Sequence, residues 1–214
     1  MVGRSKSERV LGSIGRSGII GITGGIGSGK STIARRLAEY GYTLYLSDDE
    51  AKRLLVSDLS LRHEVEQLLG KEVYRHDRYQ PEAVLSKLKS DPSLLEKLNG
   101  LVHPVVKADI LACPKRPLLV ESAILFESGI DSLCDCVIAV LAPREIRLAR
   151  VLARDKNMTE ADVLRRMEHQ LSDDELRRRA DICVLNDGSR TIEQVAGEIV
   201  NNEYLLSQRW DKSE

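Results

Sequence analysis

Residues 18–32 read GIIGITGGIGSGKST: an apolar run, then glycines, then a lysine followed by two hydroxyl residues. Within this stretch, Gly24, Gly29, Lys30 and Ser31 match the phosphate-binding pattern G-x-x-x-x-G-K-[ST]. Glycines let main-chain N–H groups approach phosphate oxygens closely, and a helix that starts here points its unpaired N–H groups at the same anion. The alternative is a glycine-rich turn before a surface lysine, but the strand pattern before it and the helix pattern after it favour a phosphate loop. The stretch therefore predicts binding of a nucleoside triphosphate.

The composition of the chain fits one α/β domain with a small insertion. Its 214 residues are 42 % hydrophobic and 30 % charged, with a formal net charge of −1. This balance gives no reason to expect nucleic acid or an anionic membrane as a partner. Aromatic residues make up only 4 %, which argues against a base-stacking platform for single strands. No apolar run approaches the roughly 20 residues that a bilayer span requires.

Both ends of the chain are expected to lie outside the folded domain. Residues 1–17 are basic and lack an apolar core segment, so we expect a flexible arm rather than a secretion signal. Residues 207–214 are polar and are expected to fray. The cysteines, at positions 113, 134, 136 and 183, lack the paired spacing of a zinc site. We expect all of them to be reduced, small apolar residues of a cytoplasmic protein.

Short apolar runs and helical periodicity alternate along the chain, which is typical of a parallel sheet flanked by helices. Strands are expected at residues 19–23, 43–46, 117–120, 135–141 and 181–185. Helices are expected at residues 31–40, 49–56, 61–69, 81–99, 105–111, 144–154, 161–171 and 191–204, and Ser172 is expected to cap another that runs through residues 177–179. Residues 71–80 are polar, and we expect a loop there.

The interval from residue 50 to about residue 116 carries no strand pattern. It predicts a helical insertion, residues 51–111, that could bind an acceptor. His103 and Pro104 are expected to open its last helix, and a helix cap is the favoured interpretation of His103 from sequence alone. The domain, residues 18–206, would then have a core at 18–50, 112–154 and 180–206 and a lid at 155–179. The buried helix faces of the insertion are expected to include Val65, Leu68, Leu69, Val84, Leu85, Leu88, Leu94, Leu95 and Leu98.

Carboxylates follow the second expected strand directly, in the run Ser47-Asp48-Asp49-Glu50. Ligands of parallel sheets collect at the carboxyl ends of strands, so these carboxylates are expected at the edge where the phosphate loop lies. Asp49 is the main candidate for a carboxylate beside an acceptor hydroxyl, and Asp48 is a lesser one. The alternative is that Ser47 or Asp48 caps the helix that follows. Both interpretations are compatible, since one residue can cap while the next faces the cleft.

Arginines recur at Arg144, Arg147, Arg150 and Arg154, which predicts a row of guanidinium groups on one helical face. Adjacent like charges cost a few tenths of a kcal/mol per pair unless an anion compensates them. The alternative is a solvated basic face. Phosphate contact is favoured because the row follows a strand end and precedes the lid, whose charged helices with thin apolar stripes suit a segment that closes over a substrate.

Among nucleotide-binding proteins, these parts favour a small-molecule kinase. Guanine-specific switches need D-x-x-G and [NT]-K-x-D patterns, and neither occurs in the chain. Motor ATPases usually have a strand that ends in Asp, whereas the third strand here ends in Glu121-Ser122, which is ambiguous. A kinase needs a phosphate cradle, Mg²⁺, a carboxylate near the acceptor hydroxyl and cations that close on the phosphoryl group. Asp49 supplies the carboxylate, and the arginine row with Arg166 of the lid supplies the cations.

The chain resembles the dephospho-CoA kinase family from about residue 19 to residue 204, nearly the whole folded part. The resemblance is carried by TGGIGSGKST at residues 23–32, Asp49, Leu98-Asn99 with His103-Pro104, Leu125-Phe126-Glu127, Arg150 with Arg154-Asp155, Arg166 with Gln170, and Asn186-Asp187-Gly188. It implies transfer of the ATP γ-phosphate to the ribose 3′-hydroxyl of dephospho-CoA, giving CoA and ADP in the last step of coenzyme A biosynthesis. The implied fold is the α/β P-loop kinase fold, a five-stranded parallel sheet flanked by helices, with a helical acceptor-binding insertion and a short helical lid.

The resemblance also implies roles for individual residues. Asp49, Lys30 and Arg154 would be catalytic, with Asp49 orienting and deprotonating the 3′-hydroxyl. ATP would be bound by Gly25, Ile26, Gly27, Ser28, Gly29, Lys30, Ser31, Thr32, Arg150, Asn186 and Gly188, with Mg²⁺ held by Ser31 through the ATP phosphates. The acceptor would be bound by Asp49, His103, Leu125, Glu127 and Arg166. The expected partners are therefore ATP and dephospho-CoA, and we expect a monomer or a weak homo-oligomer.

The sequence departs from the family pattern on the acceptor side. Ser47 stands where many members have Asp, Pro81 where Arg is usual, and Lys89 where Phe is usual. A Pro that often precedes the Leu125-Phe126-Glu127 block is also replaced. Two alternatives stay open: another nucleoside or nucleotide kinase on the same fold, and a nucleotide-binding regulator without transferase activity. Phosphorylation assays across acceptors would distinguish them.

Overall fold

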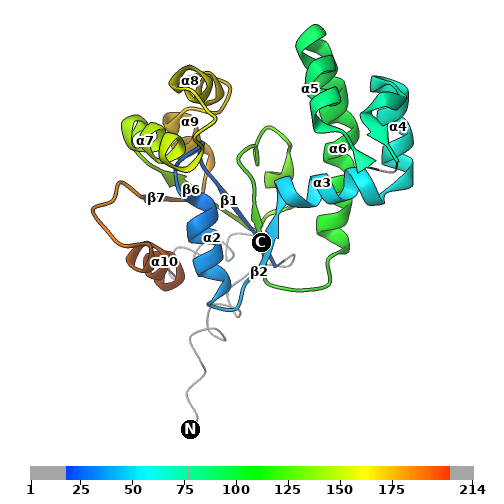
Figure 1. Ribbon diagram of the computed structural model, residues 1–214. Coiled ribbons are helices and arrows are strands. Elements are labelled where there is room, and N and C mark those ends of the chain that lie inside the picture. Colours follow the sequence, from blue (N-terminus) through cyan, green and yellow to red (C-terminus); the bar gives the residue numbers. More distant parts are fainter. Residues whose placement is uncertain (1–17, 77, 203–214) are drawn as a thin grey trace. The chain divides into compact units, whose positions relative to one another are not determined.

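The computed structural model describes residues 18–76 and 78–202 of the chain (Figure 1). These residues form two compact units. The first runs through Tyr45 and resumes at Lys115, and the second is Leu46–Pro114. The first unit contains the sheet and the phosphate loop, and the second is a helical unit with a small hairpin.

A five-stranded sheet forms the centre of the first unit, in the order β2-β5-β1-β6-β7. The central strand β1 pairs in parallel with β5 and β6, and β6 pairs in parallel with β7. Every residue of β1, β5 and β6 is buried, which explains why these runs are continuously apolar rather than alternating, with polar residues only at the ends of β1 and β5, Thr23 and Glu121. The five predicted strands are confirmed to within one residue. Their bounds are β1 (Ile19–Thr23), β2 (Thr43–Leu46), β5 (Leu118–Glu121), β6 (Cys136–Leu141) and β7 (Ile182–Leu185).

Helices cover this sheet and build the lid segment. Helices α2 and α10 pack together (Figure 1) and bury Ile33, Leu37, Val195 and Ile199 with the strands in one apolar core. The bounds are α2 (Lys30–Ala38), η2 (Ile130–Leu133), α7 (Arg144–Arg154), α8 (Glu160–Glu168), α9 (Asp173–Arg179) and α10 (Ile192–Asn201). The end predicted for α10, residue 204, lies outside the described residues.

The lid was predicted with one helix at residues 161–171 and a second that Ser172 caps. Helix α8 ends three residues earlier than predicted, at Glu168, because the chain must turn before Ser172 can start α9. The predicted cap is confirmed: the Ser172 hydroxyl accepts the N–H of Glu175, and the Glu175 carboxylate accepts the N–H of Ser172. Thr159 and Asp162 form the same reciprocal cap on α8.

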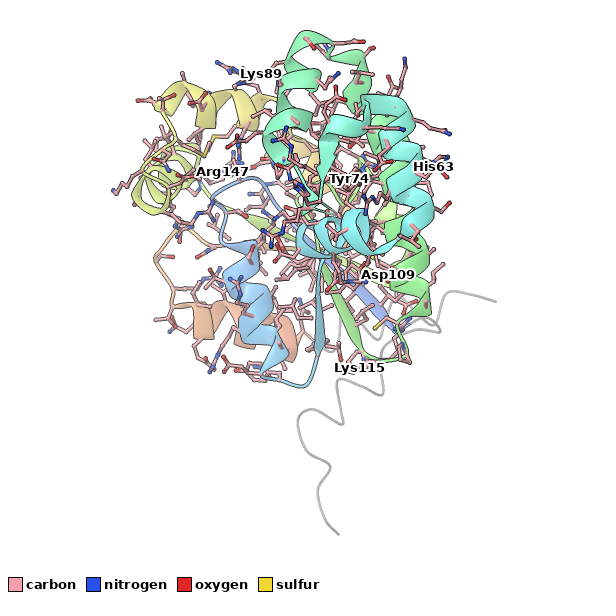
Figure 2. The ribbon with its side chains drawn as sticks, turned by 45° about the vertical axis from the view of Figure 1, so that its right-hand side comes forward. His63, Tyr74, Lys89, Asp109, Lys115 and Arg147 are labelled. Carbon is pink, nitrogen blue, oxygen red and sulfur yellow. The ribbon has the colours of Figure 1, made fainter. Side chains whose placement is uncertain are left out.

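The second unit is built from four helices around a buried apolar face. They are α3 (Ser47–Ser57), α4 (Leu59–Leu69), α5 (Pro81–Ser90) and α6 (Ser93–Ala112), with η1 (Lys71–Val73), β3 (Tyr74–Arg75) and β4 (Arg78–Tyr79) between α4 and α5. Leu61, Val65 and Ile110 are almost completely buried between α4 and α6, which pack together. Arg53 of α3 donates to Asp109 of α6, labelled in Figure 2, over 2.9 Å. This ion pair fixes α3 against α6.

Three expectations for the elements and the core of this unit are wrong. Residues 71–80 are not simply a loop, because β3 and β4 pair there in a short antiparallel hairpin. The Tyr74 and Tyr79 rings lie 5.5 Å apart, and the Tyr74 hydroxyl donates to the Leu55 carbonyl over 2.7 Å. Burial raises the pKa of Tyr74 to about 12. Each strand has two residues, too few for periodicity to reveal it.

The second wrong expectation concerns Pro104. It does not open a helix, because α6 runs through it from Ser93 to Ala112. The break lies instead before α6, where the Asp91 carboxylate accepts hydrogen bonds from the N–H and hydroxyl of Ser93. A proline inside a helix removes one N–H and crowds the carbonyl four residues earlier. Here that residue is Gly100, and the buried Leu98, Val106 and Ile110 secure the helix on both sides of Pro104.

Two of the leucines predicted to be buried are exposed instead. Leu85 of α5 is 53 % exposed and Leu95 of α6 is 50 % exposed. Helix α6 follows α5 after a short turn, and the two helices pack together. The side chains that they bury next to these positions are Val84 and Leu98. The apolar side of α5 and α6 therefore includes more leucines than this unit buries.

The cysteines are free thiols, and Cys136 and Cys183 lie in β6 and β7 as predicted. Cys183 is exposed, whereas burial raises the pKa of Cys134 to about 12. In the part of the chain that the structure describes, none of the helices combines the length and apolar character needed to cross a membrane.

Candidate active site

The phosphate loop connects β1 to α2. Strand β1 ends at Thr23, and α2 begins at Lys30 after the N-cap residue Gly29. Because Gly29 has no side chain to occupy the helix start, the N–H groups of the first turn are left for an anion. A cavity of about 300 Å³ opens there. It is lined by Gly27, Gly29, Lys30, Ser31, Thr32, Arg35, Arg150, Val151 and Arg154.

Two loop glycines are required by the packing of the protein itself. Gly27 has φ +79°, and a Cβ there would lie 2.4 Å from the Arg147 carbonyl oxygen. Gly29 has φ +90°, and a Cβ there would lie 2.3 Å from the Asn186 side-chain nitrogen. The sequence predicted these glycines from the close approach of phosphate. The structure adds a second reason, because α7 and the loop after β7 press on the phosphate loop from outside.

Glu121 is a site residue that sequence reasoning missed. It ends β5, next to β1 in the sheet, and is buried. The Ser31 hydroxyl donates to Glu121 Oε1 over 3.2 Å, and Lys30 Nζ lies 3.7 Å from the same oxygen. The available signal was a carboxylate at the carboxyl end of a strand beside the phosphate-loop strand. The Ser31 and Glu121 oxygens are the hard donors that Mg²⁺ prefers.

Arg150 and Asn186 hold the phosphate loop from the side of β7. The Asn186 amide donates to the Ser28 carbonyl over 2.7 Å. Arg150 Nη1 donates to the Asn186 carbonyl over 2.9 Å and lies 3.5 Å from the Ser28 carbonyl. Asn186 is buried. Its side-chain amide is thus committed to the loop, its N–H donates to the Leu141 carbonyl and its own carbonyl accepts from Arg150, so its role here is to position Ser28 and Arg150.

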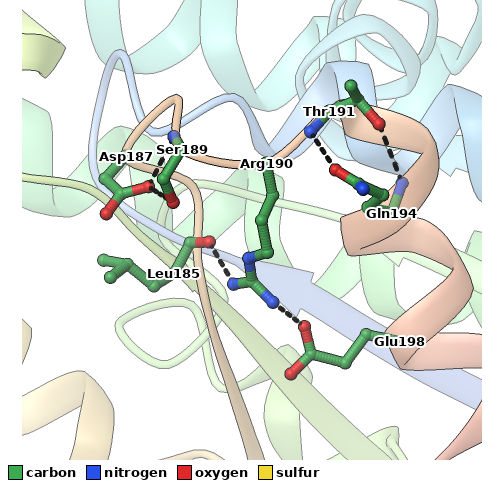
Figure 3. Close-up of polar contacts among 7 residues, drawn as sticks. All are labelled: Leu185, Asp187, Ser189, Arg190, Thr191, Gln194 and Glu198. Carbon is green, nitrogen blue, oxygen red and sulfur yellow. Dashed lines mark hydrogen bonds and ion pairs between the residues drawn. The ribbon is translucent and has the colours of Figure 1, made fainter.

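The segment after β7 is braced by its own side chains (Figure 3). The Asp187 carboxylate accepts the N–H and hydroxyl of Ser189 over 2.9 and 2.6 Å, and these bonds lower the pKa of Asp187. Arg190 donates to the Leu185 carbonyl over 2.7 Å and pairs with Glu198 of α10. Gly188, the other expected nucleotide contact here, has φ +90° and open space beside it. The turn is therefore fixed at both ends with its tip open.

The predicted arginine row is divided by the structure. Arg150 and Arg154 line the cavity. Arg147 points instead to the outside of the phosphate loop, where its Nη2 lies 3.7 Å from the Asp173 carboxylate. Arg144 is exposed at the start of α7. The structure thus brings Arg150 and Arg154 of the expected row to the cavity, and Arg144 and Arg147 do not line it.

The other expected residues of the first unit lie in two segments. Leu125 follows β5 and is fully buried against Gly21, so its side chain belongs to the core. Glu127, two residues on, is exposed. Arg166 is exposed on α8 of the lid segment. The charged groups of Glu127 and Arg166 are accessible to a ligand, whereas Leu125 could contribute only through its backbone.

Asp49 and His103 belong to the second unit. Asp49 lies in the first turn of α3 with its side chain 64 % exposed and its Oδ1 3.1 Å from Lys52 Nζ. Helix α3 begins at Ser47 after Leu46, so the alternative that Ser47 or Asp48 caps it is wrong. His103 is half-buried in the middle of α6 rather than at a helix start, and burial and the charge of Lys107 lower its pKa. Because α3 packs on α6, the carboxylate and the imidazole are on neighbouring helices.

Three of the four departures from the family pattern also lie in this unit. Ser47 is the buried first residue of α3, and Pro81 is the first residue of α5. Lys89, labelled in Figure 2, is exposed near the end of α5. Pro81 suits its position because the first turn of a helix leaves N–H groups unpaired in any case. Only Pro81 has a local structural reason, and nothing in the structure explains Ser47 or Lys89.

Comparison with known proteins shows the family of this chain. A family model described as dephospho-CoA kinase matches residues 18–191. This chain belongs to the dephospho-CoA kinase family. A dephospho-CoA kinase of Salinibacter ruber is 39 % identical over 178 residues, covering 79 % of this chain and 89 % of the relative. A dephospho-CoA kinase of Bacteroides fragilis is 35 % identical over 178 residues, covering 81 % and 86 %.

Solved structures agree with the P-loop kinase fold. A crystal structure of a Thermus thermophilus protein superposes with a TM-score of 0.73 at 34 % identity, covering 86 % of this chain and 96 % of that one. A dephospho-CoA kinase from Campylobacter jejuni has a TM-score of 0.63 at 21 % identity, with 86 % and 96 % covered. A shikimate kinase from Acinetobacter baumannii has a TM-score of 0.55 at 18 % identity, with 97 % and 99 % covered. The last two show the shared fold. The expected fold class and family are confirmed.

Proposed function

We propose that this protein transfers the γ-phosphoryl group of ATP to the ribose 3′-hydroxyl of dephospho-CoA, giving CoA and ADP. This is the reaction of its family and the last step of coenzyme A biosynthesis. One observation carries the proposal most strongly: in a chain of this family, the phosphate loop and three arginines line one cavity, and the buried Glu121 carboxylate accepts a hydrogen bond from Ser31 of that loop. The free thiols support a cytoplasmic site of action, and we propose a monomer or a weak homo-oligomer.

The donor side uses the first unit. The triphosphate would lie over the start of α2, where main-chain N–H groups and the helix dipole favour an anion. Lys30 would bind the β- and γ-phosphates, and Arg154 would neutralise the charge that develops on the transferring group. Arg150 would border the nucleotide from a position fixed by Asn186 and Ser28. The loop around Gly188 would border the base.

Mg²⁺ would be held by Ser31 and Glu121 together with the phosphates. Their oxygens meet at 3.2 Å beside Lys30. Mg²⁺ usually takes one or two protein oxygens and completes its shell with phosphate and water, so this donor set fits. When bound there, the ion would neutralise the negative charge of the phosphates.

The acceptor side would use Asp49 as the general base. Its carboxylate is exposed and fixed near the start of α3, so it can take the proton of the 3′-hydroxyl as the oxygen attacks the γ-phosphorus. The bond from that phosphorus to the β–γ bridging oxygen breaks, and ADP leaves. His103, Glu127 and Arg166 would orient the acceptor, with Leu125 supporting the segment that carries Glu127.

The test is a coupled ADP-release assay with four acceptors: dephospho-CoA, adenosine, AMP and pantothenate. We expect ADP release with dephospho-CoA to exceed the release with the other three by orders of magnitude, with CoA as the product. Preferred release with adenosine or AMP would assign a different kinase activity. ATP binding without ADP release from any acceptor would indicate a nucleotide-binding regulator instead.

A further inference from the structure

The lid segment, residues 155–179, is hydrogen-bonded to the phosphate loop. The Ile26 N–H donates to Gln170 Oε1 over 2.8 Å, although the two residues are 144 positions apart. Ile26 lies within the phosphate loop, and Gln170 lies between α8 and α9. Gln170 is one of the residues that carry the family resemblance, but the function described above gives it no role. Its contact with the loop is thus unexplained by substrate binding.

Arg147 of α7 contacts the same turn of the phosphate loop and links it to the lid segment. A Cβ on Gly25 would lie 1.9 Å from Arg147 Nη1 and 3.6 Å from Gln170 Oε1. Arg147 in turn lies 3.7 Å from Asp173 in the first turn of α9. The peptide between Gly25 and Ile26 is therefore held from outside by α7 and the lid segment together. Neither Gln170 nor Arg147 lines the cavity for phosphates.

We propose that Gln170 is a positioning residue for ATP binding: its carboxamide oxygen fixes the Ile26 amide and so keeps the phosphate loop in its anion-binding form. A loop that binds phosphate through main-chain N–H groups works best when those groups are aligned beforehand. A carboxamide suits this place because it accepts a hydrogen bond without bringing a negative charge close to a triphosphate. The proposal rests on the proposed function only in taking ATP as the ligand.

The side chain of Gln170 allows a matched set of variants. Gln170→Met keeps the length of the side chain and removes the acceptor, and Gln170→Glu keeps an acceptor and adds a charge. His169→Ala, at the exposed neighbouring position, is the control. Gln170→Ala serves as a second acceptor-free variant if the methionine disturbs packing. Thermal melting of each variant checks that the fold is retained.

Two readouts separate positioning from general support of the fold. The first is hydrogen exchange of the Ile26 amide by NMR, which we expect to be slow in the wild type and in Gln170→Glu and fast in Gln170→Met. The second is equilibrium binding of a non-hydrolysable ATP analogue. Loss of one net hydrogen bond predicts binding about 5- to 10-fold weaker in Gln170→Met. Gln170→Glu should bind more weakly at low salt and recover at high salt, because screening weakens the repulsion.

The result that would overturn the proposal is wild-type affinity for the ATP analogue in both acceptor-free variants. Weaker binding with an unchanged Ile26 exchange rate would overturn it equally, because the effect would then not pass through this amide. Both readouts are made with the ATP analogue or the free protein, so neither needs dephospho-CoA. If dephospho-CoA proves not to be the substrate, the proposed function fails while the role of Gln170 is still tested.

Discussion

The two units of the chain hold their candidate site residues in different ways. In the sheet unit, Asn186, Arg150 and Gln170 are bonded to the backbone of the phosphate loop, and Glu121 is bonded to Ser31. In the helical unit, Asp49 is largely exposed beside Lys52. Five of the six large apolar side chains that are exposed in the described residues also lie there: Val56, Leu59, Leu85, Leu95 and Leu111.

This difference follows from what each substrate requires. A triphosphate is bound largely by main-chain N–H groups, so the conformation of the loop must be fixed before the ligand arrives. Phosphorylation of an acceptor hydroxyl needs one carboxylate within reach of that hydroxyl. The rest of the acceptor substrate also needs a protein surface that it can contact. We infer that the donor half is preorganised by protein contacts, whereas the acceptor half is completed by its substrate. The predictions below test this division, beginning with the largest effect.

Asp49→Asn should abolish turnover with little change in ATP affinity. Loss of a general base costs about 10²- to 10⁴-fold in rate, and Asp49 belongs to the helical unit rather than to the phosphate loop. The measurements are kcat with dephospho-CoA and the Kd of an ATP analogue. Asp48→Asn, at the exposed neighbouring position, is the control and should keep normal kcat. Normal turnover of Asp49→Asn would refute the assigned role.

Lys30→Met should weaken both ATP binding and catalysis. Removing a positioned cation from developing phosphoryl charge costs about 10²- to 10³-fold in kcat. The change also removes the contact between Lys30 Nζ and Glu121 Oε1, 3.7 Å apart. Steady-state kinetics with ATP as the varied substrate measure the effect, and Lys71→Met, at an exposed position in the helical unit, is the control. An equal loss in both variants would contradict the division between the units.

Asn186→Ala should lower both stability and ATP affinity without removing a residue that contacts phosphate. The Ser28 carbonyl would lose a buried hydrogen bond, which costs about 1–3 kcal/mol in free energy of unfolding. Denaturant melts and titration with an ATP analogue measure the two effects. Asn157→Ala, at an exposed lid position, should change neither. Full ATP affinity in Asn186→Ala would mean that the loop needs less external support than the structure indicates.

The smallest effect concerns pH and the helical unit. Because burial and Lys107 lower the pKa of His103 in the folded protein, the unfolded chain takes up this proton first as the pH falls. The free energy of unfolding should therefore fall as the pH drops through about 6.5, toward the lower pKa of the folded state. His103→Gln should flatten the dependence of Tm on pH in this range, while His63→Gln, at an exposed position, should not. An unchanged slope in His103→Gln would show that other groups carry the dependence.

The sequence predicted the sheet unit better than the helical unit, because the features of the sheet unit are imposed on consecutive residues. Buried parallel strands must be apolar at every position, and a phosphate loop needs glycines at fixed spacing, so both are visible in the residues themselves. The bonds of Asn186 and Gln170 to the loop join residues far apart in sequence, so spacing could not reveal them. In the helical unit, α6 continues through Pro104 because tertiary packing overrides a local preference. The two strands of this unit, β3 and β4, have two residues each, which is too short for a periodic pattern of apolar residues.

The most direct test of the account is the binding of both substrates, by isothermal titration calorimetry, to Lys30→Met. If the sheet unit binds ATP and the helical unit binds dephospho-CoA, this variant should bind an ATP analogue much more weakly, while its Kd for dephospho-CoA stays at the wild-type value. Loss of both affinities, or retention of the affinity for the ATP analogue, would contradict it.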